Sequence, residues 1–470
     1  MHRHRAPIQA AVLAALAVAI VPASAQSGPD APIPHRFVVR LAAGQSIDDV
    51  AAAHGARVVS RDTARGTYVL EFPADHRDDD DLFELGGDIR MAYAEHELGL
   101  AVAEGQTQSF FPGVHPDLYT DQFFTNLIGL PTAHRESQGA GITVAILDTG
   151  IAPHPALVPV LLPNGYNFVD ENTDTDDRGN DLDDNANEEI DEKVGHGTLM
   201  AGLVSIIAPQ AQLLPVRVLN SDGVGSSFDI ARGIVYAVDQ GAKVINLSLI
   251  TTTDSHVMEE AIEYARENGA IIVAALGNSN SDRRVFPAHY EGMLAVAATT
   301  AADRRAPFSD FGGDVDLCAP GAGLVSTFPG GEFANLDGTS AASAVVSGVA
   351  ALVAAKNRRA EARTIRSIIR HNTVSIASMN HAFDGLLGSG RIAADLAVHA
   401  GVCPSDLDDG TGAGMPDGAV NVADLLYFLA QFELGARAAD LDDATGLGAR
   451  DGAVEISDLL YFLDAYAGGC

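Results

Sequence analysis

The sequence predicts an α/β fold in which a mostly parallel, doubly wound sheet carries helices on both faces. From Gly141 onward, short apolar runs alternate with helical patterns, and strands that alternate with helices usually pair in parallel. The expected strands are ITVAILD, LLPVRVL, AKVINLSL and AIIVAAL; the expected helices are HGTLMAGLVSII, SFDIARGIVYAVDQG and one ending near Asn268. Sites in such folds form at the carboxyl ends of strands, where Asp148 and Asn278 both lie.

Two smaller regions flank this central one. From His35 to about Val102 the sequence has a small α+β pattern, with strands HRFVVRL and GTYVLEFP, a helix-like SIDDVAAAHGA, an acidic helix and the segment IRMAYAEHELGLAV. After Ala400 the chain repeats itself, because Asp406, Asp417 and Asp424 recur 34 residues later. The C-terminal region is therefore an internal duplication.

The first 25 residues have the pattern of a signal peptide. Arg3 and Arg5 precede an apolar run from Ile8 to Val21, and small residues follow at Ala23–Ala25. This run is shorter than the roughly 20 residues that span a bilayer. We expect residues 1–25 to direct export, with a membrane anchor as the alternative and no transmembrane anchor in the mature chain.

The chain is strongly acidic. Its 63 acidic and 29 basic residues give a formal net charge of -34, which repels nucleic acid and anionic lipid and attracts divalent cations. We therefore expect no nucleic-acid partner, and regard most of these carboxylates as solvated surface.

Three short segments place an aspartate, a histidine and a serine among small residues, in that order. They are VAILDTG around Asp148, GHGTLMAG around His196 and DGTSAASA around Ser340. A serine hydroxyl becomes a nucleophile when an imidazole takes its proton, and the imidazole needs a carboxylate to hold its tautomer. Ser340 also opens a small and apolar segment typical of a buried helix, whose N-terminus favours negative charge. Alone, Ser340 would be read as a helix N-cap and His196 as structural; together the three predict a serine nucleophile.

With INLSL, ALGNS around Asn278, FSDFG from Phe308 and CAPG from Cys318, these segments resemble the subtilisin family (subtilases) from about Gln122 to Ala400. The resemblance implies a subtilisin-like fold and a serine endopeptidase that cleaves protein or peptide substrates through an acyl-enzyme. In that role Ser340 attacks, His196 moves the proton and Asp148 orients it. Asn278 would donate to the oxyanion; such a donor contributes about 3 kcal/mol, a figure measured on a subtilisin.

The resemblance also implies the substrate-binding residues. They lie in two segments and at the oxyanion turn: Gly225, Ser226, Ser248, Leu249, Ile250 and Gly277. The sequence departs from the family at Leu199, Ala341 and Ala344, which replace His, Met and Pro but supply no catalytic chemistry. Ile250 stands where the family usually has Gly, and its β-branched side chain is expected to reshape and narrow the primary specificity pocket.

By the same resemblance, residues 26–108 are expected to be a propeptide that assists folding and blocks the cleft, and residues 109–400 the peptidase domain. A permanent accessory domain is the alternative for the first of these regions.

An acidic loop precedes the predicted catalytic histidine. Asp181, Asp183 and Asn185, with Glu192 at the twelfth position, follow part of an EF-hand calcium loop, but Ala186 stands where its glycine should be. Calcium binding and a solvated acidic loop both remain open.

The C-terminal repeats, residues 401–470, resemble dockerin repeats, in which an EF-hand-like loop binds Ca²⁺ and the following helix packs against its copy. This implies a helical calcium-binding module that docks to a scaffold or cell-surface partner; a helical hairpin with surface acids is the alternative. Inserted segments lengthen both loops and leave the ligand register open. The apolar residues of VADLLYFLAQF and ISDLLYFLDAY are expected to be mutual core. The implied ligands are Asp406, Asp408, Asp417, Asp424, Asp440, Asp442, Asp451 and Asp458.

The three cysteines carry separate expectations. Cys403 and Cys470 bracket the C-terminal module, and a disulfide closing that 67-residue span would contribute roughly 4 kcal/mol in the chain-entropy account. Cys318, within an apolar strand, is expected to be buried and free. The terminal Gly-Gly-Cys resembles a bacterial dockerin subgroup that ends in Gly-Cys.

The sequence thus predicts a secreted, calcium-associated serine endopeptidase made as a zymogen. The competing hypothesis is a catalytically impaired peptide-binding scaffold protein, which Ile250 alone favours. No residue recommends an esterase or acyltransferase.

Overall fold

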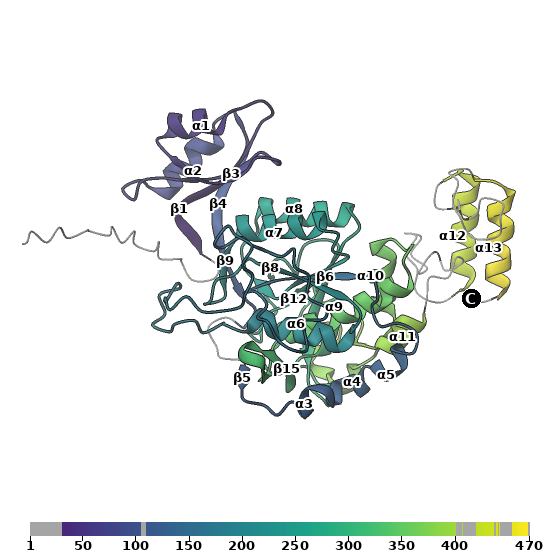
Figure 1. Ribbon diagram of the computed structural model, residues 1–470. Helices are drawn as coiled ribbons and strands as arrows, with labels where there is room; N and C mark the ends of the chain where they lie inside the picture. Colours follow the sequence, from purple (N-terminus) through teal and green to yellow (C-terminus); the bar gives the residue numbers. More distant parts are fainter. Residues whose placement is uncertain are drawn as a thin grey trace, which may run out of the picture.

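The computed structural model of the chain describes residues 31–104, 110–400, 407, 420–436, 439, 441 and 454–468 (Figure 1). The expected signal peptide, residues 1–25, lies outside the described residues. The described parts form a small N-terminal domain, a large central domain and a pair of C-terminal helices.

A nine-stranded sheet forms the centre of the large domain. Its strand order is β17-β18-β14-β13-β12-β10-β6-β8-β7, and every neighbouring pair is parallel except β17 and β18. The predicted mostly parallel α/β fold is confirmed. The strands are β6 (Thr143–Asp148), β7 (Tyr166–Asn167), β8 (Gln212–Arg217), β10 (Val244–Leu247), β12 (Ile271–Ala275), β13 (Met293–Thr299), β14 (Leu317–Pro320), β17 (Thr373–Val374) and β18 (Arg391–Ile392).

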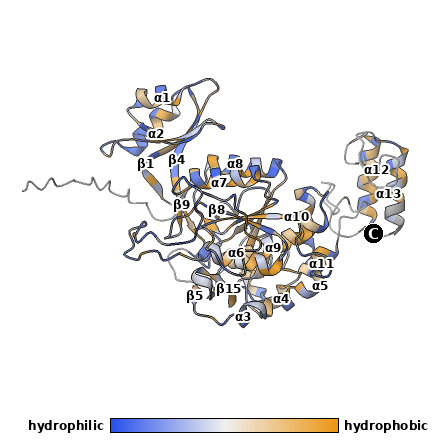
Figure 2. Ribbon diagram, in the orientation of Figure 1, coloured by the Kyte–Doolittle hydropathy of each residue, from blue (hydrophilic) through white to orange (hydrophobic). Residues whose placement is uncertain are grey.

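Helices cover both faces of this sheet, because its strands are apolar on both sides. On β6, Val144 and Ile146 pack with helices α6 (His196–Ile207) and α9 (Thr339–Lys356). The alternate residues, Ala145 and Leu147, pack with α7 (Ser227–Asp239) and α8 (His256–Glu267) on the other face. Figure 2 shows hydrophobic residues gathered around α6 and α9.

Shorter elements complete the central domain. A three-stranded antiparallel sheet packs against α6. Cys318 of β14 is a buried, free thiol, as predicted. These shorter elements include β5 (Phe110–Pro112), β15 (Leu324–Phe328), β16 (Glu332–Leu336), α3 (Asp117–Thr120), α4 (Phe123–Leu127), α5 (Leu130–Ala133), α10 (Ala362–His371), α11 (Ala394–His399) and 3-10 segments at Pro329–Gly331, Ala377–Met379 and His381–Phe383.

Helix α9 is the core helix of the large domain. By length and composition it could cross a membrane, but 89% of its apolar window is buried inside the fold. It can approach α6 closely because Gly348 has no side chain: a Cβ there would lie 2.7 Å from Ile207 Cβ. The high content of small residues in this helix therefore reflects packing inside a globular core.

The N-terminal domain is the predicted α+β unit. Its strands pair antiparallel in the order β2-β3-β1-β4, and its core includes Phe37, Leu70 and Leu85. Strand β2 at the edge of this sheet had not been predicted, because its sequence RVVSRD is largely polar. The elements are β1 (Pro32–Leu41), α1 (Ile47–His54), β2 (Arg57–Asp62), β3 (Thr67–Glu71), α2 (Asp78–Gly86) and β4 (Met91–Val102).

Strand β4 continues from this domain into the large one (Figure 1). Its first half pairs with β1, and its second half pairs antiparallel with β9 (Val224–Ser226) on one side and β11 (Leu249–Ile250) on the other. The N-terminal domain is therefore joined to the large domain by main-chain hydrogen bonds as well as by side chains.

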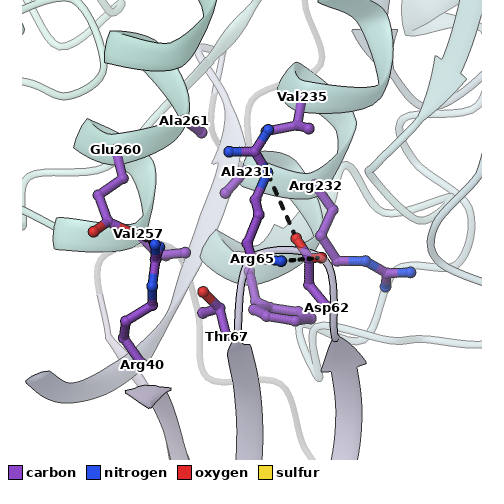
Figure 3. A pocket seen from close by; sticks show the side chains of 11 residues that line it. Arg40, Asp62, Arg65, Thr67, Ala231, Arg232, Val235, Val257, Glu260 and Ala261 are labelled. Carbon is purple, nitrogen blue, oxygen red and sulfur yellow. Dashed lines mark hydrogen bonds and ion pairs between the residues drawn. The ribbon is translucent and has the colours of Figure 1, made fainter. Parts of the chain in front are cut away.

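Side chains of the N-terminal domain also meet helices α7 and α8. Glu95 accepts hydrogen bonds from the backbone N–H groups of His256 (2.7 Å) and Val257 (3.0 Å), which open α8. This is the contact that a capping carboxylate makes at a helix N-terminus. Nearby, Arg40 of β1 pairs with Glu260 at 2.7 Å, and both line a pocket between the domains (Figure 3).

The C-terminal helices, α12 (Val422–Glu433) and α13 (Ile456–Gly468), repeat each other's contacts. Phe428 and its counterpart Phe462 stack with ring centroids 4.1 Å apart. Only part of the expected mutual core is found: among the helix residues described, Phe428 and Phe462 are buried and Phe432 is half-buried, but large apolar side chains on each helix are exposed. The exposed ones are Val422, Leu426, Leu429, Ile456, Leu460 and Leu463.

The close approach of α9 and α6 yields a test of the fold. In a Ser340→Ala background, which prevents self-digestion, we expect Gly348→Val to lower the free energy of unfolding by about 1–3 kcal/mol, because the added methyl groups overpack the contact with Ile207. Denaturant unfolding measures this change. Gly313→Ala is the control: nothing lies within 4 Å of its new methyl group, and it should change stability by less than about 0.5 kcal/mol.

Candidate active site

Asp148 and His196 meet at the carboxyl end of the central sheet. Asp148 ends β6, His196 begins α6, and Asp148 Oδ1 lies 2.7 Å from His196 Nδ1, with both side chains buried. Gly197 makes this meeting possible, since a Cβ there would lie 2.1 Å from Gly150 O. The His-Gly pair of the sequence thus has a packing reason. A carboxylate in this place holds the Nδ1–H tautomer and leaves Nε2 for chemistry.

A second buried carboxylate fixes the start of α6. Asp177 accepts hydrogen bonds from the backbone N–H of Gly195 (2.9 Å) and of Thr198 (3.1 Å), and from the Thr198 hydroxyl (2.7 Å). Burial raises its pKa despite these bonds. Sequence reasoning missed this residue, because it is one of many acids in the loop before His196.

Ser340 lies in the first turn of α9, and its hydroxyl meets the histidine through a third residue. Ser340 Oγ donates to Glu104 Oε2 at 2.8 Å, and His196 Nε2 lies 3.0 Å from the same oxygen. Glu104 comes two residues after the end of β4. Its carboxylate therefore lies where the serine and histidine would act on a substrate.

Asn278 completes the arrangement from the loop after β12. Its Nδ2 donates to Glu104 Oε1 at 3.2 Å, and its Oδ1 accepts from the Thr339 backbone N–H at 2.9 Å. The second bond sets the orientation of the amide. A Cβ at Gly338 would lie 1.9 Å from Glu104 Oε1, so this glycine leaves room for the oxygen.

The charges of the site stabilise one another. Burial alone would lower the pKa of His196, but the negative charges of Asp148 and Glu104, with their hydrogen bonds, raise it to about 10. For Glu104, burial acts to raise the pKa; the charge of His196 and the bonds from His196 and Ser340 outweigh it, so the pKa is lowered. Burial lowers the pKa of Lys193, and the charge of Glu104 acts in the opposite direction. Both pKa shifts favour an imidazolium–carboxylate pair at neutral pH.

The predicted substrate-binding segments lie on either side of β4. Ser226 and Gly225 of β9 pair with Gly99 and Leu100, and Leu249 and Ile250 of β11 pair with Val102 and Ala101. Two more main-chain bonds follow: Val102 N–H donates to Gly223 O (3.0 Å) and Ala103 N–H to Ser248 O (3.2 Å). We call the space between β9 and β11 that the end of β4 occupies the substrate groove. At its end, Gly277 of the oxyanion turn faces Ile250.

The acidic loop does not gather its predicted ligands. Asp183 and Asn185 both accept from the Asn187 backbone N–H, while the Asn185 amide donates to Glu192. The Asp181 N–H donates to Asp191. In the described part of the chain, no group of three or more His, Cys, Asp and Glu side chains is placed to hold a metal ion.

Of the ligands expected in the C-terminal repeats, Asp424 and Asp458 are described, and both are buried. They accept matching backbone bonds: Asp424 from Leu407 (2.6 Å) and Asn421 (2.8 Å), Asp458 from Leu441 (2.5 Å) and Glu455 (2.7 Å). The other expected ligands and both ends of the predicted disulfide lie outside the described residues: Asp406, Asp408, Asp417, Asp440, Asp442, Asp451, Cys403 and Cys470.

Comparisons with known proteins agree with this geometry. A sequence profile described as the subtilase family matches residues 139–397. Subtilisin BL of Lederbergia lenta is 38% identical over 278 residues, which cover 57% of this chain and 95% of that protein. Thermitase of Thermoactinomyces vulgaris is 37% identical over 273 residues, 56% of this chain and 91% of that protein.

Solved structures show the same fold. Fervidolysin from Fervidobacterium pennivorans, described as a keratinolytic enzyme related to subtilisin, superposes with a TM-score of 0.64 at 22% identity, covering 78% of this chain and 61% of that one. A protease from Pseudoalteromonas arctica superposes with a TM-score of 0.53 at 31% identity, covering 58% of this chain and 94% of that one.

The paired charges of His196 and Glu104 predict how the stability of the full chain depends on pH. The pKa of His196 is raised from its ordinary value of 6.5 to about 10. Protonated His196 therefore contributes fully to the free energy of unfolding below pH 6.5, and this contribution is lost as the pH rises toward 10. Calorimetry of the Ser340→Ala chain should show this decline, and Glu104→Gln should lower stability near pH 6.5 and flatten the decline. Glu84→Gln, at an exposed position, should leave it unchanged. Equal slopes for the Glu104 variant and its parent would contradict the pairing.

Proposed function

The chain belongs to the subtilase family of serine proteases, and from that premise we propose that Ser340, His196 and Asp148 carry its reaction. The protein is a subtilisin-like serine endopeptidase that acts on protein substrates. The observation that carries the assignment of residues is the 2.7 Å contact between buried Asp148 and His196, with Ser340 Oγ and His196 Nε2 both within hydrogen-bond reach of one oxygen atom.

In the proposed reaction, Ser340 Oγ attacks the substrate carbonyl while His196 Nε2 takes its proton, and Asp148 stabilises the imidazolium that forms. His196 then gives the proton to the leaving amine. In the second half, water attacks the acyl-enzyme while His196 takes its proton, and that proton passes to Ser340 Oγ as the acid product leaves. Asn278 Nδ2 and the amides at the start of α9 stabilise the oxyanion. The contact between Asn278 and Glu104 supports the oxyanion role of Asn278, since Asn278 Nδ2 already donates a hydrogen bond to a carboxylate oxygen.

Residues 26–108 act in this proposal as a propeptide that keeps the enzyme inactive. The end of β4 runs between β9 and β11 as a substrate strand would, and the next residues bring Glu104 against the serine, the histidine and the oxyanion donor. A substrate cannot bind until this segment leaves. The contact favours a removable inhibitor over a permanent accessory domain, because the peptidase domain, residues 109–400, is blocked while it persists.

We further propose that residues 1–25 direct export and that residues 401–470 are a dockerin-like module that docks to a scaffold or cell-surface partner. The matching backbone bonds of Asp424 and Asp458 and the stacked Phe428 and Phe462 support a duplicated unit. The exposed apolar residues that recur on α12 and α13 give such a partner a surface to contact.

Structural calcium is proposed for the loops of this module. The acidic loop at Asp181, Asp183 and Asn185 does not fit it as the structure stands. The side-chain oxygens of Asp183 and Asn185 accept from the Asn187 backbone N–H, and among the described residues no three His, Cys, Asp or Glu side chains are placed to hold a metal ion. In the C-terminal loops, aspartates recur with the repeat and supply the oxygen donors that calcium prefers. Bound there, the ion would offset the repulsion among these carboxylates.

The first test is labelling of the purified chain by a fluorophosphonate, which reacts with an activated serine. We expect the wild type to be labelled once it has lost about its first hundred residues, and Ser340→Ala to remain intact and unlabelled. Intact mass gives both results. Asp148→Asn should fold but lose at least about a thousand-fold in labelling rate, because the imidazole loses its orienting carboxylate. A processed wild type that takes no label would favour the peptide-binding scaffold.

Calcium removal tests the C-terminal assignment. In the Ser340→Ala chain we expect a chelator to lower the melting temperature of the C-terminal module and to expose α12 and α13 to an added protease, with recovery on adding calcium. Paired Asp417→Asn and Asp451→Asn substitutions should have the same effect without chelator. If chelator changes neither the melting curve of this chain nor the activity of the wild type, the metal assignment is wrong.

A further inference from the structure

Ile250 fills the end of the substrate groove in a way that glycine could not. Its side chain is 7% exposed and lies in a small apolar cluster with Ala103 and Ala275. Its Cδ1 reaches across from β11 to the oxyanion turn, where it lies 3.4 Å from the point that a Cβ on Gly277 would occupy. Ile250 thus extends from β11 to the Gly277 turn, beside the catalytic serine.

The residue that occupies this space in the full chain is Ala103, whose methyl group is 3% exposed. Main-chain bonds hold it there: Val102 N–H donates to Gly223 O, and Ala103 N–H donates to Ser248 O. The following residue, Glu104, contacts Ser340 Oγ. Ala103 is therefore the last residue of the bound strand before the catalytic centre, where the residue on the amino side of a scissile bond would lie.

A larger side chain at this point has little room. Ile250 is β-branched, so its χ1 rotamers are restricted and it cannot easily turn away. The Gly277 turn is itself closely packed, since a Cβ on Gly277 would lie 2.4 Å from the carboxylate of buried Asp310. Extra methylene groups forced into such a packed contact are unfavourable.

We infer that Ile250 restricts this endopeptidase to peptide bonds that follow a small side chain such as alanine. The inference rests on the proposed function and names the substrate class for the same site. It also assigns the bond between Ala103 and Glu104 as one that the enzyme can cleave once the Glu104 carboxylate has moved away from Asn278, His196 and Ser340. Ser340 Oγ would then form an ester with the Ala103 carbonyl while His196 takes its proton, and the Glu104 amine would leave with that proton. Water would hydrolyse the ester.

The test compares two chromogenic tetrapeptides that differ only in having Ala or Phe before the scissile bond. The processed enzyme is first titrated with fluorophosphonate, so that rates refer to active molecules. We expect the wild type to have kcat/KM about ten-fold or more higher for Ala. Ile250→Gly should raise kcat/KM for Phe about ten-fold or more and change that for Ala much less, with Ile250→Val between them. Ile190→Gly makes the same substitution at an exposed isoleucine outside the groove and should leave the ratio unchanged.

A labelled wild type that prefers Phe, or an Ile250→Gly enzyme with an unchanged ratio, would overturn the inference and leave the peptidase assignment standing. Absence of labelling in a processed wild type would overturn both, so the two failures are distinguishable. Replacing Ala103 by Phe in the full chain gives a second readout that needs no added substrate. Slower loss of the N-terminal domain in this variant than in Val102→Ala, with the difference removed by Ile250→Gly, supports the inference; equal rates of loss contradict it.

Discussion

Strand β4 is the constraint on which both large parts of the molecule depend. One half of it completes the sheet of the N-terminal domain, and the other half pairs with a strand of the central domain on each side. Because the backbone groups of a buried strand must be hydrogen-bonded, the register of β4 in one domain determines which residues reach the groove of the other. The placement of Glu104 against Ser340 and His196 follows from that register.

Much of the fold and part of the site were predictable from the sequence, for physical reasons. The central strands are apolar on both faces and alternate with helices, so their parallel pairing follows from local pattern. Asp148 and Asn278 follow strands, and parallel strands bring their carboxyl ends to one edge. The glycines beside His196 and Ser340 reflect close approaches that leave a signature in the sequence.

The remaining features depend on contacts that no local pattern encodes. Glu104 is distant in sequence from every residue it touches at the site, and nothing around it marks it as different from the many other acids. Asp177 was hidden in the same way, among carboxylates that are mostly solvated. The polar β2 forms because it pairs with β3, a case in which tertiary pairing outweighs composition. At the C-terminus, helical spacing identified apolar positions, but two helices have too few neighbours to bury them all, so Phe428 and Phe462 are buried while Leu426 and Leu460 are exposed.

The hydrogen bonds that Glu95 accepts from the start of α8 separate the cleavage of the chain after β4 from the release of the N-terminal domain. The acceptor belongs to the N-terminal domain and the donors to the central one, so hydrolysis of a peptide bond after β4 breaks none of these contacts. In the proposed zymogen, the severed domain would remain bound as a non-covalent inhibitor, held also by the strand pairs with β9 and β11. Its dissociation would then time the onset of activity, and a molecule that has already been cut would stay inactive until release.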